Sequence, residues 1–288
     1  MKILITGANG MLARAETEHC RSLGDDVTAL SRTELDISDR DSVFSLVQEL
    51  KPEYVLNCAA YTDVDGAETN ERHAYAANAD GVNNLALACK SIDAGFITVS
   101  TDYVFNGDQQ GFYTQRHTPE PRGIYAQSKL AGEQRARGAY GRSIIVRSGW
   151  IYGLGGTNFL SVMPKLLAEG KVIKPISDAY GTPTYAVDLA IRIRELAKLD
   201  LPAIFHVTNE GPGVSFLDFA QRVCEIAGYD KNLIEPVSLA ALKRPAPRPR
   251  SSKLACLFSE RLGLEPLPHW EAALQRYLDS RESSAASN

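Results

Sequence analysis

Short apolar runs alternate with amphipathic stretches through the first half of the 288-residue chain. The apolar runs cover residues 2–5, 27–30, 54–57, 96–100 and 143–147, and helical periodicity separates them near 10–23, 39–50, 71–90 and 124–137. Apolar strands that alternate with helices are typical of a parallel sheet covered on both faces. The pattern therefore predicts an α/β fold built on a doubly wound parallel (Rossmann) sheet.

The alternation loosens after about residue 150, where glycine and proline punctuate 153–156 and 175–183. We expect a helix near 184–198 capped by Thr184, a strand near 203–208 and a helix near 215–227. Three prolines exclude regular structure from 243–250. The expected division is a Rossmann domain of 1–149 plus about 171–200, a smaller α/β substrate-binding lobe of about 150–170, 201–233 and 251–280, and a disordered tail of 281–288.

Composition and charge narrow the functional class. The chain carries 31 basic and 35 acidic side chains, a net charge of −4, which does not suit a protein that coats nucleic acid. No apolar run approaches the roughly 20 residues of a membrane span, and the N-terminal run is too short for a signal peptide. The five cysteines include no C-x-x-C pair, and the five histidines lack metal-ligand spacing. We expect a cytoplasmic protein with reduced thiols, no metal site, and neither a membrane nor a nucleic acid as partner.

The first predicted strand runs directly into a glycine-containing loop, TGANGMLA at residues 6–13. Gly7 permits a tight turn, Gly10 permits close approach of backbone to a pyrophosphate, and Ala13 is small enough for helix-on-strand packing. The N-terminus of the following helix offers free N–H groups to phosphates. A plain strand–turn–helix corner is the alternative, but the position at the head of a β–α series favours a dinucleotide site.

The end of the second strand bears on the choice of cofactor. Ser31 and Arg32 stand where a carboxylate would grip the ribose diol of NAD. Since an arginine can pair with a 2′-phosphate, these residues favour NADPH, and NADH is the alternative cofactor. The alternative for Arg32 is a solvated charge in the loop. Asp36 and Ile37 follow and are expected near the adenine.

Tyr125 and Lys129 lie four residues apart at the start of a predicted helix, on one helix face. A tyrosine pKa of about 10 is too high for ready proton exchange at neutral pH, and a nearby cation lowers it. We therefore expect Lys129 to lower the pKa of Tyr125, which becomes a general acid for a carbonyl under reduction. Thr101 ends the fourth strand, where ligands of open parallel sheets bind, and offers a hydroxyl to the same site. The alternative for Thr101 is strand-end packing.

The chain resembles the extended short-chain dehydrogenase/reductase superfamily in its glycine-containing loop, Thr101 and the Tyr-x-x-x-Lys pair. Further segments resemble the dTDP-4-dehydrorhamnose reductase family within it, in order from residue 1 to about 255. These segments are NCAAYTDVD at 57–65, ANADGV at 77–82, STDYVF at 100–105, SKLAGE at 128–133, RSGWIYG at 147–153, GTNF at 156–159, PTYA at 183–186 and APRP at 246–249.

The resemblance implies NADPH-dependent reduction of the 4-keto group of dTDP-4-dehydro-L-rhamnose to dTDP-L-rhamnose, for polysaccharide biosynthesis. It assigns catalysis to Thr101, Tyr125 and Lys129. The implied cofactor contacts are Gly7, Gly10, Met11, Leu12, Arg32, Asp36, Ile37, Ala59, Ala60, Tyr61, Tyr125 and Lys129. Some family members dimerise through magnesium, so a homodimer is one expected assembly, although no ligand cluster for the metal is evident.

The implied substrate contacts are Thr101, Asp102, Trp150 and Arg248. Trp150 has an apolar face suited to a sugar, with a core position as the alternative. Arg248 is placed to meet a diphosphate, with a solvated linker or a weak nucleic-acid tether as alternatives. Acidic residues at 63, 65 and 68 fit a solvated face or helix start better than a pair of catalytic carboxylates.

The sequence departs from the family pattern at Ala13, Asn106 and Ala126, and none of these changes removes a reacting group. Two other functions stay open. One is reduction of a different nucleotide-linked keto sugar, since the stereochemical outcome depends on pocket shape. The other is a non-catalytic NADP-binding regulatory subunit, against which the intact Thr101, Tyr125 and Lys129 argue.

Overall fold

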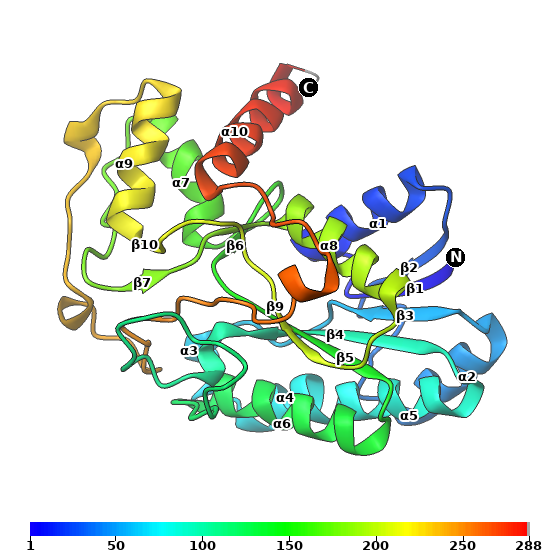
Figure 1. Cartoon of the computed structure of the whole chain (residues 1–288). Helices are drawn as coiled ribbons and strands as arrows, with labels where there is room; N and C mark the ends of the chain where they lie inside the picture. The colour runs from blue at the N-terminus through cyan, green and yellow to red at the C-terminus, as the bar shows by residue number, and fades with distance from the viewer. Residues whose placement is uncertain (287–288) are drawn as a thin grey trace.

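Six parallel strands form the central sheet of the computed structural model, which describes residues 1–286 (Figure 1). Their order across the sheet is β2-β1-β3-β4-β5-β9, and every neighbouring pair is parallel. The predicted parallel Rossmann-like sheet is confirmed. The strands are β1 (Lys2–Thr6), β2 (Asp26–Leu30), β3 (Tyr54–Asn57), β4 (Gly95–Thr101), β5 (Ser143–Ser148) and β9 (Ile204–His206).

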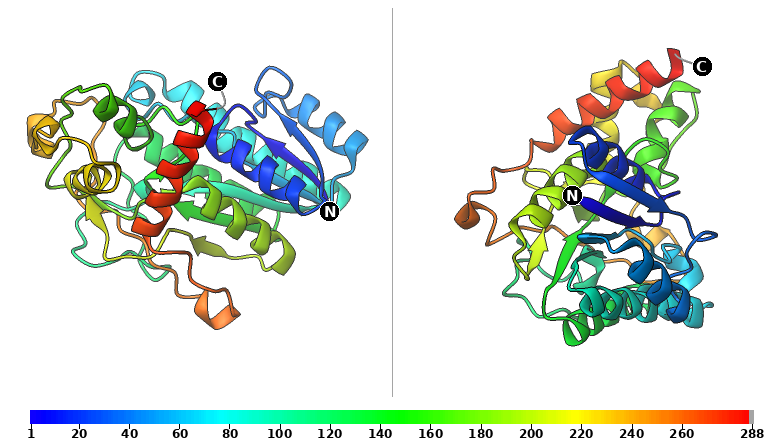
Figure 2. Two further views of the ribbon diagram at one scale, coloured as in Figure 1. Left: turned by 90° about the horizontal axis from the view of Figure 1, so that it is seen from above. Right: turned by 90° about the vertical axis from the view of Figure 1, so that its right-hand side faces the viewer.

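Both faces of the sheet are covered by helices, as the apolar runs require (Figure 2). Ile3 and Ile5 of β1 face α1 (Met11–Ser22) and α8 (Ala186–Leu199), whereas Leu4 between them belongs to the core on the opposite face. That opposite layer consists of α2 (Arg40–Leu50), α5 (Val82–Ile92) and α6 (Ile124–Ala139). Alternate side chains of one strand therefore enter two cores, which explains why the strand sequences are continuously apolar.

The helix expected near 71–90 is divided into three parts. After the short α3 (Val64–Ala67), α4 (Glu71–Tyr75) leads into a π-helical segment η1 (Ala76–Gly81) before α5 begins. Gly132 of α6 lies so close to the carbonyl of Asn78 that a side chain there would collide with it. The π segment therefore lies where two helices make close contact. Short π-helical segments of this kind are frequent at functional sites.

The remaining elements form a smaller lobe around Tyr152, Phe219 and Tyr277. It contains β6 (Ile151–Tyr152), α7 (Phe159–Ala168), β7 (Tyr180–Gly181), β8 (Thr184–Tyr185), β10 (Val214–Ser215), α9 (Phe216–Ala227) and α10 (Trp270–Ala286). Short 3-10 turns lie at η2 (Asp102–Val104), η3 (Lys231–Leu233), η4 (Leu239–Ala241) and η5 (Glu260–Leu262). None of the helices within residues 1–286 is long and apolar enough to cross a bilayer.

Two segments differ from the expected division of the chain. The strand at 204–206 joins the main sheet beside β5, although 201–233 was expected in the lobe. Ile173 bridges to Ile234 and β7 pairs with β10, although 171–200 was expected in the Rossmann part. Pairing between segments far apart in sequence decides both placements, so local patterns do not reveal them. With these changes, the two-part division stays our proposal.

Two local expectations are wrong. The helix expected near 184–198 is present as Ala186–Leu199, but Thr184 does not cap it, because its hydroxyl donates to the carbonyl of Gly149 (2.9 Å). The expected disordered tail is helical over 281–286, because α10 continues to Ala286 and the Arg281 guanidinium packs over the Tyr277 ring. Residues 287–288 lie outside the described part of the chain.

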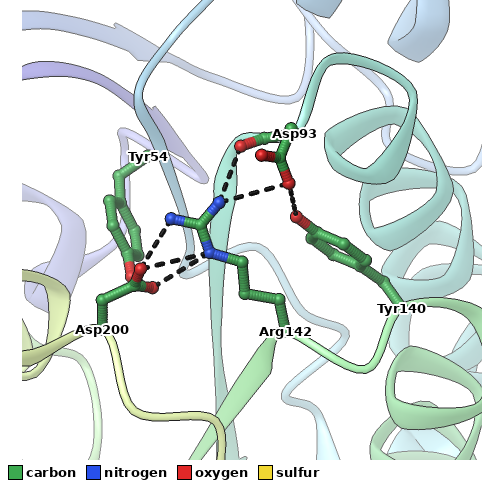
Figure 3. Close-up of polar contacts among 5 residues, drawn as sticks. All are labelled: Tyr54, Asp93, Tyr140, Arg142 and Asp200. Carbon is green, nitrogen blue, oxygen red and sulfur yellow. Dashed lines mark hydrogen bonds and ion pairs between the residues drawn. The ribbon is translucent and has the colours of Figure 1, made fainter.

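An arginine clamp joins the helix-to-strand connections at the amino edge of the sheet (Figure 3). Arg142, just before β5, binds both carboxylate oxygens of Asp200 and the carbonyl of Asp93 (2.8 Å). Asp93 and Asp200 follow α5 and α8 with φ of 56° and 50°. The phenols of Tyr54 and Tyr140 donate to Asp200 and Asp93. One guanidinium thus holds three connections in register.

Replacing Arg142 with alanine is expected to lower the free energy of unfolding by about 1–3 kcal/mol, because several charge-assisted hydrogen bonds are lost at a site one-third exposed. Urea unfolding followed by circular dichroism measures the change. Arg135→Ala, which breaks an exposed pair with Asp80, is the control and is expected to cost under about 0.5 kcal/mol. Equal stability of the two variants contradicts a clamping role.

Candidate active site

A cavity of about 1080 Å³ opens at the carboxyl ends of the central strands, between the sheet and the lobe. Such ends are where open α/β sheets bind ligands, and β1 here has β2 on one side and β3 on the other, which makes it the switch point. Most of the predicted site residues are brought together in its wall. These are Gly10, Met11, Leu12, Ala60, Thr101, Asp102, Tyr125, Lys129, Trp150 and Arg248.

The loop after β1 has the geometry that a pyrophosphate needs. Gly7 has a φ of 77°, and a Cβ on it would lie 2.7 Å from the backbone nitrogen of Ala59. Gly10 is the N-cap of α1, and no side chain caps this helix end. Ala13 is fully buried beneath it. The free N–H groups of the first turn therefore face the cavity and suit an anion.

Asn57 at the end of β3 holds the two loops of this switch point together. Its Oδ1 accepts hydrogen bonds from the Thr6 hydroxyl (2.6 Å) and from the backbone N–H of Ala59 (3.2 Å). Its Nδ2 donates to the Thr98 hydroxyl on β4 (2.9 Å). A single buried amide thus positions Ala59 behind Gly7, whereas Ala60 reaches the cavity wall.

The residues expected at the adenosine end lie outside this cavity. Arg32 has a 77% exposed side chain that pairs with Asp36 (3.3 Å). Ile37 is buried, and a Cβ on Gly81 would lie 2.5 Å from it. The backbone N–H of Ala8 in the glycine loop donates to the carbonyl of Leu30, the last residue of β2. The end of β2, two residues before Arg32, therefore adjoins the phosphate loop.

Tyr125 and Thr101 meet at the cavity wall, but the expected effect of Lys129 on Tyr125 is absent. Burial raises the pKa of Tyr125 to about 12, and the Asp102 carboxylate raises it further against a hydrogen bond with Thr101. The Thr101 hydroxyl also donates to Asp102 (3.1 Å). The expectation of a lowered pKa is wrong for the free protein, because burial outweighs the neighbouring charges and the Lys129 ammonium is directed elsewhere, toward the carbonyl of Val99 (2.7 Å).

Lys129 is buried beside an ion pair. Burial lowers its pKa to about 8, and the charge of Glu133 one helical turn away acts in the opposite direction. Glu133 is itself held by Arg147 on β5 (2.6 Å) and by the Ser100 hydroxyl on β4 (2.5 Å). The lysine environment is therefore set by two strands as well as by its own helix.

The start of α6, which carries Tyr125, is fixed by side chains from distant segments. Glu68 accepts a hydrogen bond from the backbone N–H of Ile124 (2.8 Å), the first residue of the helix. Asn78 in the π segment donates to the Ser128 hydroxyl (3.0 Å) and accepts from the backbone N–H of Tyr61 (2.8 Å). Tyr61 is thus positioned through its backbone, and sequence reasoning gave Asn78 and Glu68 no such role.

An aromatic pair forms the lobe side of the cavity. Trp150 has a φ of 51°, unusual for a bulky residue, and its ring stacks on Phe216 with centroids 3.8 Å apart. Gly181 lies so close to the indole that a side chain there would collide with it. Both aromatic residues line the cavity and also pack against the lobe core, so Trp150 has a place in each. Phe216 was missed, because nothing in its local sequence distinguishes it from a packing residue.

Two acidic residues shape the substrate end. Asp102 is buried, which raises its pKa to about 6 against hydrogen bonds from Ser252 and Thr101. Asp65 of α3 pairs with Arg248 (3.0 Å) and Arg244 (3.2 Å), and both arginines line the cavity. Asp65 therefore has specific partners, and Arg244 joins the site although only Arg248 had been expected there.

Comparisons with known proteins identify the family of this chain. The RmlD substrate binding domain family matches residues 1–283. A dTDP-4-dehydrorhamnose reductase of Mycobacterium tuberculosis is 40% identical over 99% of this chain and 95% of its own length, and one of Streptomyces griseus is 41% identical over 94% and 91%. A crystal structure of dTDP-4-dehydrorhamnose reductase from Bacillus anthracis in complex with NADP is 36% identical, with a TM-score of 0.93 over 97% of this chain and 100% of that one. The chain therefore belongs to the RmlD substrate binding domain family, together with these reductases.

Proposed function

We propose that this protein reduces the 4-keto group of dTDP-4-dehydro-L-rhamnose to give dTDP-L-rhamnose, with NADPH as the reductant. The observation that carries the proposal is the convergence of Thr101, Tyr125 and Lys129 on one cavity with the uncapped N-terminus of α1. A hydroxyl, a phenol and an ammonium beside a dinucleotide site suit carbonyl reduction. The names of the relatives support the keto sugar as substrate.

NADPH fits the residues present at the switch point. The space left by Gly7 and the free N–H groups after Gly10 suit its pyrophosphate, with Met11 and Leu12 alongside. The bound cofactor supplies the hydride. Arg32 is placed at the end of β2 to meet a 2′-phosphate, with Asp36 and Ile37 toward the adenine, and Ala59, Ala60 and Tyr61 follow the dinucleotide.

Tyr125 donates the proton. With a pKa of about 12 the phenol holds its proton at neutral pH and releases it only to a stronger base, the alkoxide oxygen that forms at C4. Thr101 orients the carbonyl through its hydroxyl, which Asp102 already engages. Lys129 holds the nicotinamide ribose and supplies a positive charge near the developing alkoxide.

The substrate is held by residues of both halves of the molecule. Trp150 contributes an apolar face for the sugar ring, and Asp102 a polar contact beside Thr101. Arg248 meets the diphosphate. We further expect a cytoplasmic protein that acts on this small-molecule substrate without nucleic acid, membrane or metal, and a homodimer as its assembly.

Replacing Tyr125 with phenylalanine is expected to lower kcat by about 10²–10⁴-fold, because the proton donor is lost while the packing is kept. Absorbance at 340 nm with NADPH and dTDP-4-dehydro-L-rhamnose measures the rate. Tyr229→Phe, which packs against the lobe core and is not among the residues that line the cavity, is the matched control and is expected to keep full activity. Undiminished turnover in the Tyr125 variant rules out this proton donor. If the unchanged protein binds NADPH but does not turn over the keto sugar, it is a non-catalytic binding subunit.

Replacing Arg32 with alanine is expected to weaken NADPH binding about tenfold and to leave NADH binding unchanged, because only NADPH carries the 2′-phosphate. Fluorescence titration with both cofactors measures the two dissociation constants. Arg40→Ala, an exposed arginine over the Phe44 ring, serves as the control. Equal loss for both cofactors argues against 2′-phosphate recognition by Arg32.

The pH dependence is set by Lys129. Since burial lowers its pKa to about 8, the ammonium loses its proton as the pH rises through 8, and kcat/KM for reduction is expected to fall with that midpoint. Glu133→Gln removes the charge that favours the protonated lysine, so the midpoint moves to lower pH. Initial rates between pH 6 and pH 9.5 provide the measurement, with Glu120→Gln as the control. A wild-type profile that stays flat to pH 9.5 contradicts the role given to Lys129.

A further inference from the structure

The arginine-proline segment 243–250, which we call the strap, leads from the lobe toward α3 of the dinucleotide half (Figure 1). Its residues Arg244, Arg248 and Pro249 line the cavity. Four residues before the strap begins, the backbone N–H of Leu239 donates to Asp178 (2.5 Å). At its far end, Pro249 lies against Gly107, where a Cβ would come within 2.5 Å of it. The strap has no regular structure, as three prolines predict, and its far end packs against Gly107.

Three groups of the strap converge on one carboxylate. Asp65 Oδ2 lies 3.2 Å from Arg244 Nη1 and 3.0 Å from Arg248 Nη2, and Asp65 Oδ1 accepts a hydrogen bond from the backbone N–H of Ala246 (3.2 Å). Arg248 Nη1 also donates to the carbonyl of Ala246 (3.1 Å). Both arginines line the cavity that contains Tyr125, and Asp65 pairs with both of them.

This arrangement resembles an anion site that already contains an anion. An arginine presents five N–H donors in a planar fork, and one carboxylate oxygen shared by two guanidiniums uses few of them. Although burial opposes it, the Ala246 N–H and the two arginines keep the pKa of Asp65 below its usual value, so the carboxylate is charged at neutral pH. The remaining donors are available to a second anion.

We propose that Arg244 and Arg248 form a two-arginine clamp for the diphosphate of the nucleotide sugar, and that Asp65 occupies this clamp in the free protein and yields its ion pairs when the diphosphate binds. The inference rests on the proposed function, which supplies a nucleoside diphosphate at this end of the cavity. A diphosphate offers enough charged oxygens to engage both arginines, whereas a single small anion competes poorly with the tethered carboxylate. Asp65 is therefore a specificity-determining residue, and Arg244 is a substrate contact.

Calorimetric titration of the NADPH-loaded protein with dTDP tests the clamp without requiring turnover. Arg244→Ala is expected to weaken dTDP binding about tenfold or more, through the loss of charge-assisted hydrogen bonds. Asp65→Asn keeps the acceptor for Ala246 but removes the competing charge, so dTDP is expected to bind roughly three- to tenfold tighter and inorganic pyrophosphate to become a competitor. Arg250→Ala, an exposed strap arginine outside the cavity wall, is expected to bind dTDP as the unchanged protein does.

Each contrary outcome overturns a stated part of the inference. Unchanged dTDP binding by Arg244→Ala removes the clamp. Weaker binding by Asp65→Asn shows that the carboxylate positions the arginines and is not displaced. Failure of the proposed reaction can be told apart from failure of the clamp. If the unchanged protein does not turn over dTDP-4-dehydro-L-rhamnose but Arg244→Ala still weakens dTDP binding, the clamp holds for another nucleotide sugar. Normal turnover and an unchanged KM in Arg244→Ala refute the clamp alone.

Discussion

The close approach of two loops at the switch point is the constraint on which the site depends. Gly7 after β1 and Ala59 after β3 come so near that no side chain fits between them, and Asn57 fixes their separation through hydrogen bonds to both loops. This contact directs the first turn of α1 toward the cavity. A displaced loop would misplace the cofactor relative to Tyr125 on a different helix, and a shift of about 1 Å is costly to catalysis.

Burial sets the chemistry of the reacting groups. It raises the pKa of Tyr125 and of Asp102 and lowers that of Lys129, so all three are moved toward their uncharged forms. A neutral phenol holds a proton to donate, whereas the charge of Glu133 opposes the effect of burial on the lysine. The pair of Glu133 with Arg147 is itself buried, so the electrostatics of the site extend into the core of the sheet.

The lobe and the strap provide the part of the site that is not common to parallel α/β proteins. Trp150 adopts a left-handed backbone conformation to bring its ring against Phe216, and strain of this kind gathers at functional sites. The strap brings arginines from near the end of the chain to Asp65 near its beginning. Both features enlarge the cavity wall with residues from segments more than sixty positions apart.

The sequence by itself determined the strands from β1 to β5, the parallel sheet, the glycine loop and the order Thr101, Tyr125, Lys129, because each depends on local periodicity or on spacing within a helix or strand. It also predicted an irregular strap from its prolines. Tertiary structure decided that residues 204–206 join the main sheet, that Phe216 stacks on Trp150, that Asp65 and Arg244 belong to the site and that the pKa of Tyr125 is raised. The physical reason is common to all of these: pairing, stacking and desolvation depend on what lies alongside a residue in space, and those neighbours come from parts of the chain that no local pattern connects.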